Sequence, residues 1–378
     1  MEAGFIPERI VRMRSCTWTL VLHAIALVFL ATASEARVVT AKWGRYEGQN
    51  VWLYTLTNLN GIEAQVTNYG AILVLVRAPD RYGKFVQVVQ GFDSLAEYTS
   101  PDYLRRGGHY GAVMGRYANR IKGEAYTLEG VAYRRTKAGK PFDERVWSGQ
   151  VEDGDEPKVT LTLTDPAGNM GFPGTVQASV TYTLTKDNVL RLDFRATSDA
   201  TTIVNMASHA YFNLAGSGTV LDHYLTINSD AITPGDALNV PTGEIRAVKG
   251  TAFDFRSPKR IGQDIDSPDP LLQQVGGYGV NYRLNGVPGT LRLAARLHDP
   301  GSGRIMEEWT TQSDMQLYSG NYEPPPVALA KGYRVRSGVA LEAERAPNSP
   351  NIPAFLSPIV TPQKPLHEVV EFRFLVDR

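Results

Sequence analysis

The sequence predicts an all-β protein, built as one large sandwich of antiparallel β-sheets. From Trp43 onward, short runs of alternating or β-branched residues recur between turn signals. Helical periodicity sustained over more than two turns is nearly absent. The 35 glycines and 23 prolines punctuate the chain without a fixed internal period, which favours a sandwich over a propeller or a solenoid.

The strand pattern is clearest in segments that turn residues separate. These segments are residues 50–58, 63–68, 71–78, 85–90, 158–164, 176–185, 189–196, 219–228, 290–297 and 368–376. Lys186-Asp187-Asn188 lies between two of them and fits a hairpin with a short polar turn. We expect single helical turns at residues 93–98 and 257–261. The acidic, glycine-rich stretch 149–156 is expected to be a surface loop rather than a domain boundary.

The N-terminal segment predicts export. Basic residues precede the apolar run 18–33, which ends in small residues suited to cleavage. This run is shorter than the ~20 apolar residues of a membrane span, so no stable membrane anchor is expected after processing. We therefore predict a secretory signal peptide at residues 1–36 and one domain at residues 37–378, periplasmic or secreted. Cleavage after Ala33 and a start at Met13 remain open.

Composition narrows the classes of partner. The chain has 378 residues with 39 basic and 39 acidic side chains, so it carries no net charge. This balance argues against nucleic acid and anionic membranes as partners. The single cysteine, Cys16, lies within the predicted signal peptide, so the mature chain would use neither disulfides nor a thiol nucleophile. The sequence sets no oligomeric state.

Two residues far apart in the chain suit acid–base chemistry. His209 lies in the apolar, strand-like stretch 205–216, and an imidazole can donate a proton near neutral pH. The alternative is a half-buried histidine that is hydrogen-bonded within a sheet. Glu342 follows an apolar run and precedes a turn-rich segment, so a carboxylate at the end of a strand can face a cleft there. Its alternative is a solvated or ion-paired glutamate.

Further segments carry a family resemblance. They are Thr67-Asn68-Tyr69-Gly70-Ala71 and residues 89–95, 111–121, 250–256 and 316–321. Together with the stretches around His209 and Glu342, they resemble the aldose 1-epimerase (galactose mutarotase) family, in family order from about Trp43 to Phe374. The resemblance implies a large antiparallel sandwich with the sugar in an open cleft on one sheet. It also implies interconversion of α and β anomers by ring opening and reclosure, without metal or organic cofactor.

The resemblance assigns roles to five residues. His209 would be the acid that protonates the ring oxygen, and Glu342 the base that takes the anomeric hydroxyl proton. Asn119, Arg120 and Gln316 fall on positions that contact sugar hydroxyls. A guanidinium offers a rigid fork of donors, and an amide offers both a donor and an acceptor, as hydroxyl recognition needs. Two alternatives remain open: a structural ion pair for Arg120, and hydrogen bonds from Asn119 and Gln316 to the backbone of loops.

The chain also departs from the family at two binding positions. A Leu-His-Gly-Gly segment is absent ahead of the run Pro141-Phe142-Asp143-Glu144-Arg145-Val146-Trp147, so a second substrate-binding histidine is missing. Gly279 stands where the family has an aspartate that contacts the sugar. A lost hydrogen bond commonly costs about 0.5–1.5 kcal/mol, so the two losses predict roughly ten- to thousandfold weaker binding.

The remaining candidates have mainly structural expectations. His109 is expected to be a loop histidine, with entry into the cleft as a substitute ligand as the alternative. Asp254 is expected to form a structural turn with Arg256. We expect three other histidines to be structural or to lie at the surface: His223, His298 and His367.

Two function classes compete. One is an aldose 1-epimerase, and the other is a catalytically weak or inactive carbohydrate-binding protein on the same fold. Retention of both His209 and Glu342 favours the enzyme, because a binder needs no matched acid and base. A glycoside hydrolase would need two suitably spaced carboxylates, and no such pair is identifiable. The missing anchors predict an aldose whose recognition differs from that of galactose or glucose, such as a substituted or oligomeric sugar.

Overall fold

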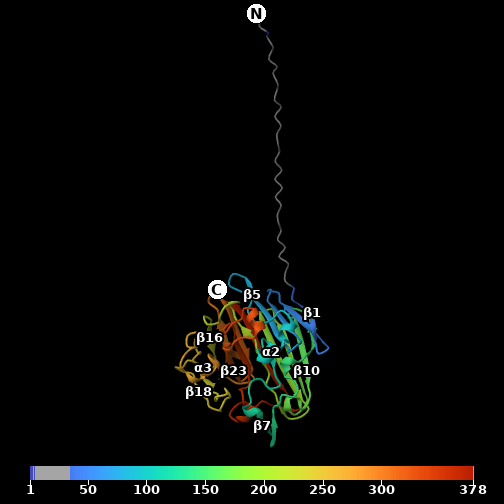
Figure 1. The fold of residues 1–378 in the computed structure, drawn as a ribbon, viewed down its shortest axis with the longest axis vertical. Coiled ribbons are helices and arrows are strands. Elements are labelled where there is room, and N and C mark those ends of the chain that lie inside the picture. The colour runs from blue at the N-terminus through green and yellow to red at the C-terminus, as the bar shows by residue number, and fades with distance from the viewer. Residues whose placement is uncertain (3, 5–34, 378) are drawn as a thin grey trace. The chain divides into compact units, whose positions relative to one another are not determined.

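The computed structural model describes residues 1, 2, 4 and 35–377. The predicted signal peptide lies outside the described residues except for residues 1, 2, 4, 35 and 36, and it stays a prediction. Within the described part, no helix is long and apolar enough to cross a membrane. Residues 37–377 form antiparallel sheets with a few short helices, which confirms the all-β prediction (Figure 1).

Three large sheets build the domain. The five-stranded sheet contains, in order, β1 (Arg37–Tyr46), β2 (Gln49–Thr57), β3 (Glu63–Thr67), β4 (Leu73–Pro79) and β5 (Phe85–Gln87). The nine-stranded sheet contains β19 (Lys259–Arg260), β16 (Tyr224–Ile227), β21 (Arg292–His298), β22 (Arg304–Thr310), β26 (Leu366–Val376), β12 (Val189–Ser198), β11 (Val176–Leu184), β10 (Lys158–Asp165) and β9 (Ser148–Glu152). The six-stranded sheet contains β15 (Tyr211–Phe212), β24 (Val339–Glu344), β23 (Asp314–Tyr318), β20 (Gly279–Arg283), β17 (Ala231–Thr233) and β18 (Arg246–Ala247).

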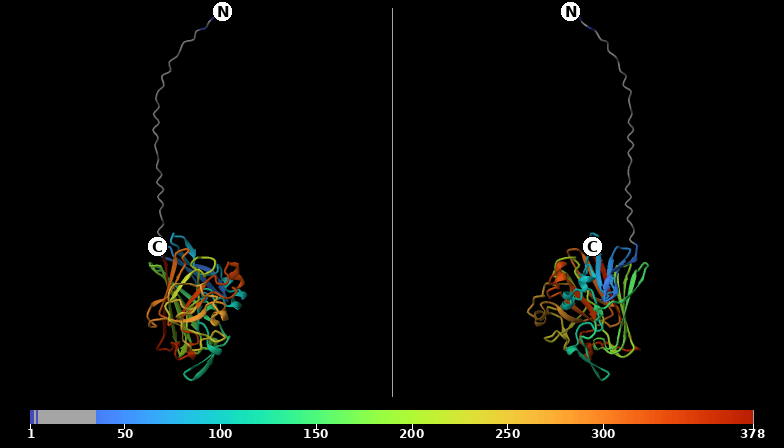
Figure 2. Two further views of the ribbon diagram at one scale, coloured as in Figure 1. Left: turned by 90° about the vertical axis from the view of Figure 1, so that its left-hand side faces the viewer. Right: turned by 45° about the vertical axis from the view of Figure 1, so that its right-hand side comes forward.

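Smaller elements complete the chain. Two-stranded pairs join β13 (Thr202–Ile203) to β25 (Ile359–Val360), β14 (Ala207–Ser208) to β6 (Val113–Met114), and β7 (Ala125–Leu128) to β8 (Val131–Arg134). The α-helices are α1 (Leu95–Tyr98), α2 (Pro101–Arg106), α3 (Pro270–Val275) and α4 (Pro326–Ala330). Single 3₁₀ turns are η1 (Lys122–Glu124), η2 (Phe142–Glu144), η3 (Asn169–Gly171) and η4 (Ser349–Asn351). The β7–β8 hairpin projects from the domain, and the start of β1 lies at the same end as the C-terminus (Figure 2).

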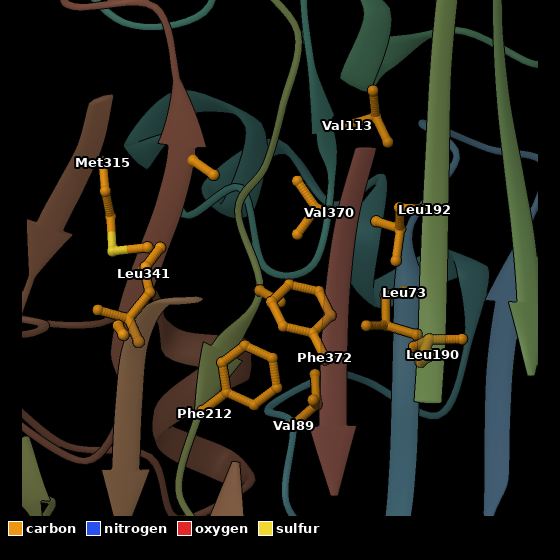
Figure 3. Close-up of a cluster of buried hydrophobic side chains, with 14 of the residues drawn as sticks. Leu73, Val89, Val113, Leu190, Leu192, Phe212, Met315, Leu341, Val370 and Phe372 are labelled. Carbon is orange, nitrogen blue, oxygen red and sulfur yellow. The ribbon is translucent and has the colours of Figure 1, made fainter. Parts of the chain in front are cut away.

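The main core lies where the nine-stranded sheet packs against the other two. In β11 and β12 every second side chain is buried, as expected of strands with one face in a core. Phe372 of β26 meets Phe212 of β15 with ring centroids 4.9 Å apart, and Leu341 of β24 belongs to the same buried cluster (Figure 3). Burial of these large apolar groups therefore fixes β15 and β24, the strands nearest the site described below.

Most predicted strands are confirmed to within a few residues. The hairpin at residues 186–188 is confirmed, because β11 and β12 pair up to Leu184 and Leu190 around it. The helical turn at residues 93–98 is confirmed as α1, where the Ser94 amide donates to the Glu97 carboxylate at 2.9 Å. This contact closes the first turn, as in a capping box.

Three local predictions are wrong. Part of the stretch 149–156 forms β9, a fully exposed edge strand that pairs with β10 on one side only, so burial gives it no alternating pattern. The helical turn at residues 257–261 is instead β19, which pairs Arg260 with Tyr224. The strand at residues 219–228 shortens to β16, because Val220 and His223 form a turn joined by a 3.1 Å backbone hydrogen bond.

Candidate active site

Strand register brings His209 and Glu342 together. β15 pairs with β24 so that Tyr211 lies opposite Ala340. In an antiparallel pair, stepping two residues along each strand keeps the same face, so this register extended toward β14 sets His209 opposite Glu342. The imidazole Nε2 lies 3.5 Å from the carboxylate Oε2. Glu342 is within β24 rather than at a strand end, and both side chains are largely buried.

The same row continues across the six-stranded sheet. Gln316 of β23 pairs with Glu342, and Asn281 of β20 pairs with Gln316. These side chains therefore share one face of the sheet with His209. Asn281 is held by Thr233 at 2.9 Å, whereas the Gln316 amide has no partner among the described residues. The row thus combines an imidazole, a carboxylate and a free amide at one surface.

Asn119 and Arg120 approach from the loop that follows β6. Asn119 has a positive φ of 64°, and its amide donates to the buried Glu344 carboxylate at 2.9 Å. Asn205 also donates to Glu344, at 3.2 Å. The Asn119 amide is therefore oriented by a side chain, and not by loop backbone. Arg120 is exposed and forms no ion pair within the described residues, which excludes the structural ion pair there.

One cavity of about 570 Å³ is lined by the five residues to which the sequence assigned roles: His209, Glu342, Gln316, Asn119 and Arg120. Its volume lies within the ~300–1,000 Å³ that small-molecule sites occupy. Two tyrosine rings flank the imidazole, with centroids 5.0 Å (Tyr211) and 6.5 Å (Tyr318) from that of His209. Aromatic walls with convergent polar groups are the usual make-up of a pocket for a small polar ligand.

Burial shifts the pKa values of the acid–base pair in opposite directions. It lowers the pKa of His209 to about 3, with a smaller effect from the charge of His109. It raises the pKa of Glu342 to about 8, with a smaller contribution from Glu308. The 3.5 Å contact opposes both shifts, because the imidazolium and the carboxylate attract one another. Across the neutral range the pair therefore holds one proton between two groups.

His109 also lies at the cavity, contrary to the expectation of a loop histidine apart from the cleft. Its ring centroid is 5.8 Å from that of His209, and its Nδ1 lies 2.8 Å from Oδ2 of Asp143. Burial alone would lower the pKa of His109, but the hydrogen bond and charge of Asp143 raise it above its usual value. The only sequence signal was a histidine next to the glycines Gly107 and Gly108 and to Tyr110.

The space at Gly279 is occupied by other side chains. A Cβ added there would lie 3.0 Å from Cγ2 of Val275 and 3.9 Å from the amide nitrogen of Asn239. Asn239 donates to the Gly279 carbonyl at 3.0 Å, and both Asn239 and Val275 line the cavity. The cavity wall where the aspartate is missing is therefore built from an amide and an apolar side chain, neither of which the sequence singled out.

The structural expectations for the other residues are confirmed. His223 is buried and accepts from the Leu214 amide at 3.0 Å. His298 contacts Asp377 at 2.8 Å, and His367 contacts Asp193 at 3.1 Å. Asp254 forms two 2.8 Å contacts with Arg256. In the described part of the chain, no group of three or more His, Cys, Asp or Glu side chains is placed to hold a metal ion.

Known proteins are similar to this chain over most of its length. The family model described as aldose 1-epimerase matches residues 53–373. The chain is similar to galactose mutarotase from Bos taurus, with 34% identity over 328 residues that cover 83% of this chain and 92% of that protein. It is similar to aldose 1-epimerase from Escherichia coli (strain K12), with 32% identity over 88% of this chain and 97% of that protein. The crystal structure of galactose 1-epimerase from Lactobacillus acidophilus NCFM matches with a TM-score of 0.80 at 26% identity, covering 91% of this chain and 100% of that one.

Proposed function

Because this chain belongs to the aldose 1-epimerase family and interconverts the α and β anomers of an aldose, we propose that His209 and Glu342 perform the proton transfers. The observation that carries the proposal is the 3.5 Å contact between an imidazole and a carboxylate on the wall of the cavity. A general acid and base must lie within reach of one small substrate, and this geometry provides that.

The proton balance follows from the two groups. Glu342 removes the proton from the anomeric hydroxyl while His209 donates a proton to the ring oxygen, and the bond between the ring oxygen and C1 breaks. Rotation about the C1–C2 bond then presents the opposite face of the C1 aldehyde to the hydroxyl that recloses the ring. On reclosure Glu342 returns its proton to the new anomeric oxygen, and His209 recovers its proton from the attacking hydroxyl. The site ends in its starting state and needs no other reactant.

Three further residues would hold the sugar during this sequence. Gln316 is adjacent to Glu342, and its amide, unpaired among the described residues, can both donate to and accept from a hydroxyl. The guanidinium of Arg120 has no partner in the described part of the chain, and the amide of Asn119 is held toward Glu344. We assign these side chains to sugar hydroxyls. Fixing the sugar at several points keeps the ring oxygen and the anomeric hydroxyl aligned with the acid and base.

The catalytic assignment is tested by His209→Asn and Glu342→Gln. Each change should abolish measurable anomer exchange, followed by NMR magnetisation exchange, while leaving sugar binding largely intact. His367→Ala is a suitable control, because His367 is exposed on β26 and pairs with Asp193. Exchange that survives in both variants would show that these residues are not the catalysts.

We also propose that the preferred aldose is neither glucose nor galactose. The support is the absence of the histidine-containing loop and the cavity wall at Gly279, where Val275 and Asn239 replace a carboxylate. Exchange rates across hexoses, pentoses, 6-deoxy sugars and disaccharides should reveal a better substrate. If glucose and galactose are the best substrates, this proposal is wrong. If no sugar exchanges faster than in buffer, the chain acts as a sugar-binding protein.

A further inference from the structure

Resting on the proposed function, we propose that His109, held by Asp143, donates a hydrogen bond from Nε2 to a hydroxyl of the bound sugar. Its Nδ1 is occupied by Asp143 at 2.8 Å, whereas Nε2 has no partner among the described residues. The ring lies 5.8 Å from that of His209 on the wall of the same cavity. A sugar that reaches His209 therefore passes within reach of His109.

The backbone is shaped to present this imidazole. Helix α2 ends at Arg106 and is capped by Gly107, where φ is 61°, and His109 itself has a φ of 47°. Left-handed conformations cost a non-glycine residue energy, and such strain collects at functional sites. At Gly107 an added Cβ would lie 3.1 Å from Nε2 of His109, so the glycine leaves room around this nitrogen. Hydrogen bonds from Ala112 to the His109 carbonyl at 3.0 Å and from Tyr110 to the Tyr103 hydroxyl at 2.9 Å hold the loop.

Asp143 is suited to position the ring. It belongs to the turn η2, where Phe142 is buried and its carbonyl accepts from the Trp147 indole at 3.1 Å. One carboxylate oxygen contacts His109, and the other is buried without a partner among the described residues. A carboxylate on Nδ1 fixes the orientation of an imidazole and favours its protonated form, in which both nitrogens donate.

The surroundings favour a charged donor at this position. The negative groups near His109 are Asp143 and Glu144, and both raise its pKa. The ring of His209 lies 5.8 Å from that of His109, and because the pKa of His209 is low, it adds little positive charge near neutral pH. Hydrogen bonds from charged donors are stronger than those from neutral ones. His109 thus fills the role of a second sugar-binding histidine from a different segment of the chain.

The test compares His109→Ala and His109→Gln with the control His367→Ala, using the best substrate of the sugar panel. His109→Ala should raise KM by about ten- to a hundredfold, as expected for a lost charged hydrogen bond, with a much smaller change in kcat. His109→Gln keeps a donor and should lie between His109→Ala and wild type. An unchanged KM for a His109→Ala protein with native circular dichroism overturns the proposal.

Asp143→Asn tests the positioning role through a double-mutant cycle. The single change should raise KM, whereas it should add little in the His109→Ala background, because both act through one hydrogen bond. Equal effects in both backgrounds would show that Asp143 does not act through His109.

The two proposals fail in different ways. If His209→Asn abolishes exchange but His109→Ala leaves KM unchanged, the proposed catalysts stand and this inference falls. If wild type shows no exchange with any sugar, the catalytic proposal falls. NMR titration with the sugar panel then still tests whether His109 binds the sugar, because the proposal requires that His109→Ala weakens sugar binding.

Discussion

His209 and Glu342 face one another across 3.5 Å with pKa values shifted in opposite directions, and this determines the expected pH dependence. From about pH 3 to about pH 8 the pair holds one proton, and the productive form, protonated imidazole with ionised carboxylate, holds the same number. We expect kcat/KM to be level through neutral pH and to fall above about 8, where the pair loses that proton.

The measurement is kcat/KM from pH 5 to 10 by NMR exchange, corrected for the buffer rate. Because Asp143 also raises the pKa of His109, the same profile is measured for His109→Gln, in which only the pair of His209 and Glu342 remains to titrate of these three groups. A rate that rises as the pH passes 8 would contradict the one-proton scheme. It would mean that the active enzyme has lost the proton from both groups.

Glu308 makes a second residue-level prediction, about stability. It is fully buried on β22, and burial raises its pKa well above the usual value, against a smaller lowering effect from the backbone amide of Ala343. The folded state therefore keeps a proton that the unfolded chain releases above its ordinary pKa. Stability should fall as pH rises above that value, by up to about 1.4 kcal/mol per pH unit.

Glu308→Gln keeps the shape and removes the titration. We expect the variant to lose stability less steeply than wild type between pH 5 and 9 in urea unfolding. The comparison must be a difference between the two proteins, because Glu342 and Glu344 also have raised pKa values and contribute to both curves. Parallel curves would show that Glu308 is not a buried neutral acid.

At the scale of elements, the core contact between β15 and β26 supports the strand pairing at the site. Phe372 and Phe212 are fully buried with ring centroids 4.9 Å apart. Phe372→Ala should cost about 3–5 kcal/mol, since it removes a large side chain and leaves a cavity. Leu238→Ala is the control, because this leucine is 74% exposed and surface changes usually stay within about 0.5 kcal/mol. If Phe372→Ala and wild type had equal free energies of unfolding, the packing of Phe372 against Phe212 would be contradicted.

Helix α3 and strand β20 give a second prediction at this scale. Gly279→Asp should destabilise the protein by about 1–3 kcal/mol, because the new Cβ would meet Val275 at 3.0 Å. Combining it with Val275→Ala should recover part of that loss, so the two changes should be non-additive in urea unfolding. Additive effects would show that Val275 is not what fills the space at Gly279.

At the scale of the whole molecule, we propose that residues 1–36 direct export and are then removed. The support is the order of basic, apolar and small residues in the sequence. Mass spectrometry should find a mature N-terminus near Arg37 in the periplasm or the medium. A variant that starts with methionine followed by Arg37 should stay inside the cell. Recovery of an uncleaved, membrane-extracted chain would contradict the prediction.

The sequence predicted the strands with one buried face better than those buried on both. β11 and β12 alternate in burial, and this local pattern can be read from the order of residues. Strands β20, β23 and β24 of the six-stranded sheet are buried on both faces for most of their length and show no alternation. The sequence alone did not delimit them, although they carry Gln316 and Glu342.

The sequence by itself determined the all-β class and, through its resemblance to a known family, His209 and Glu342 as the candidate acid and base. Only the tertiary structure decided that these two groups meet at 3.5 Å, that His109 turns into the same cavity, and that Val275 fills the space at Gly279. The physical reason is the distance along the chain between the residues that interact. Periodicity depends on neighbours a few residues apart, whereas contacts between β15, β24, α2 and α3 depend on strand register and packing over the whole chain.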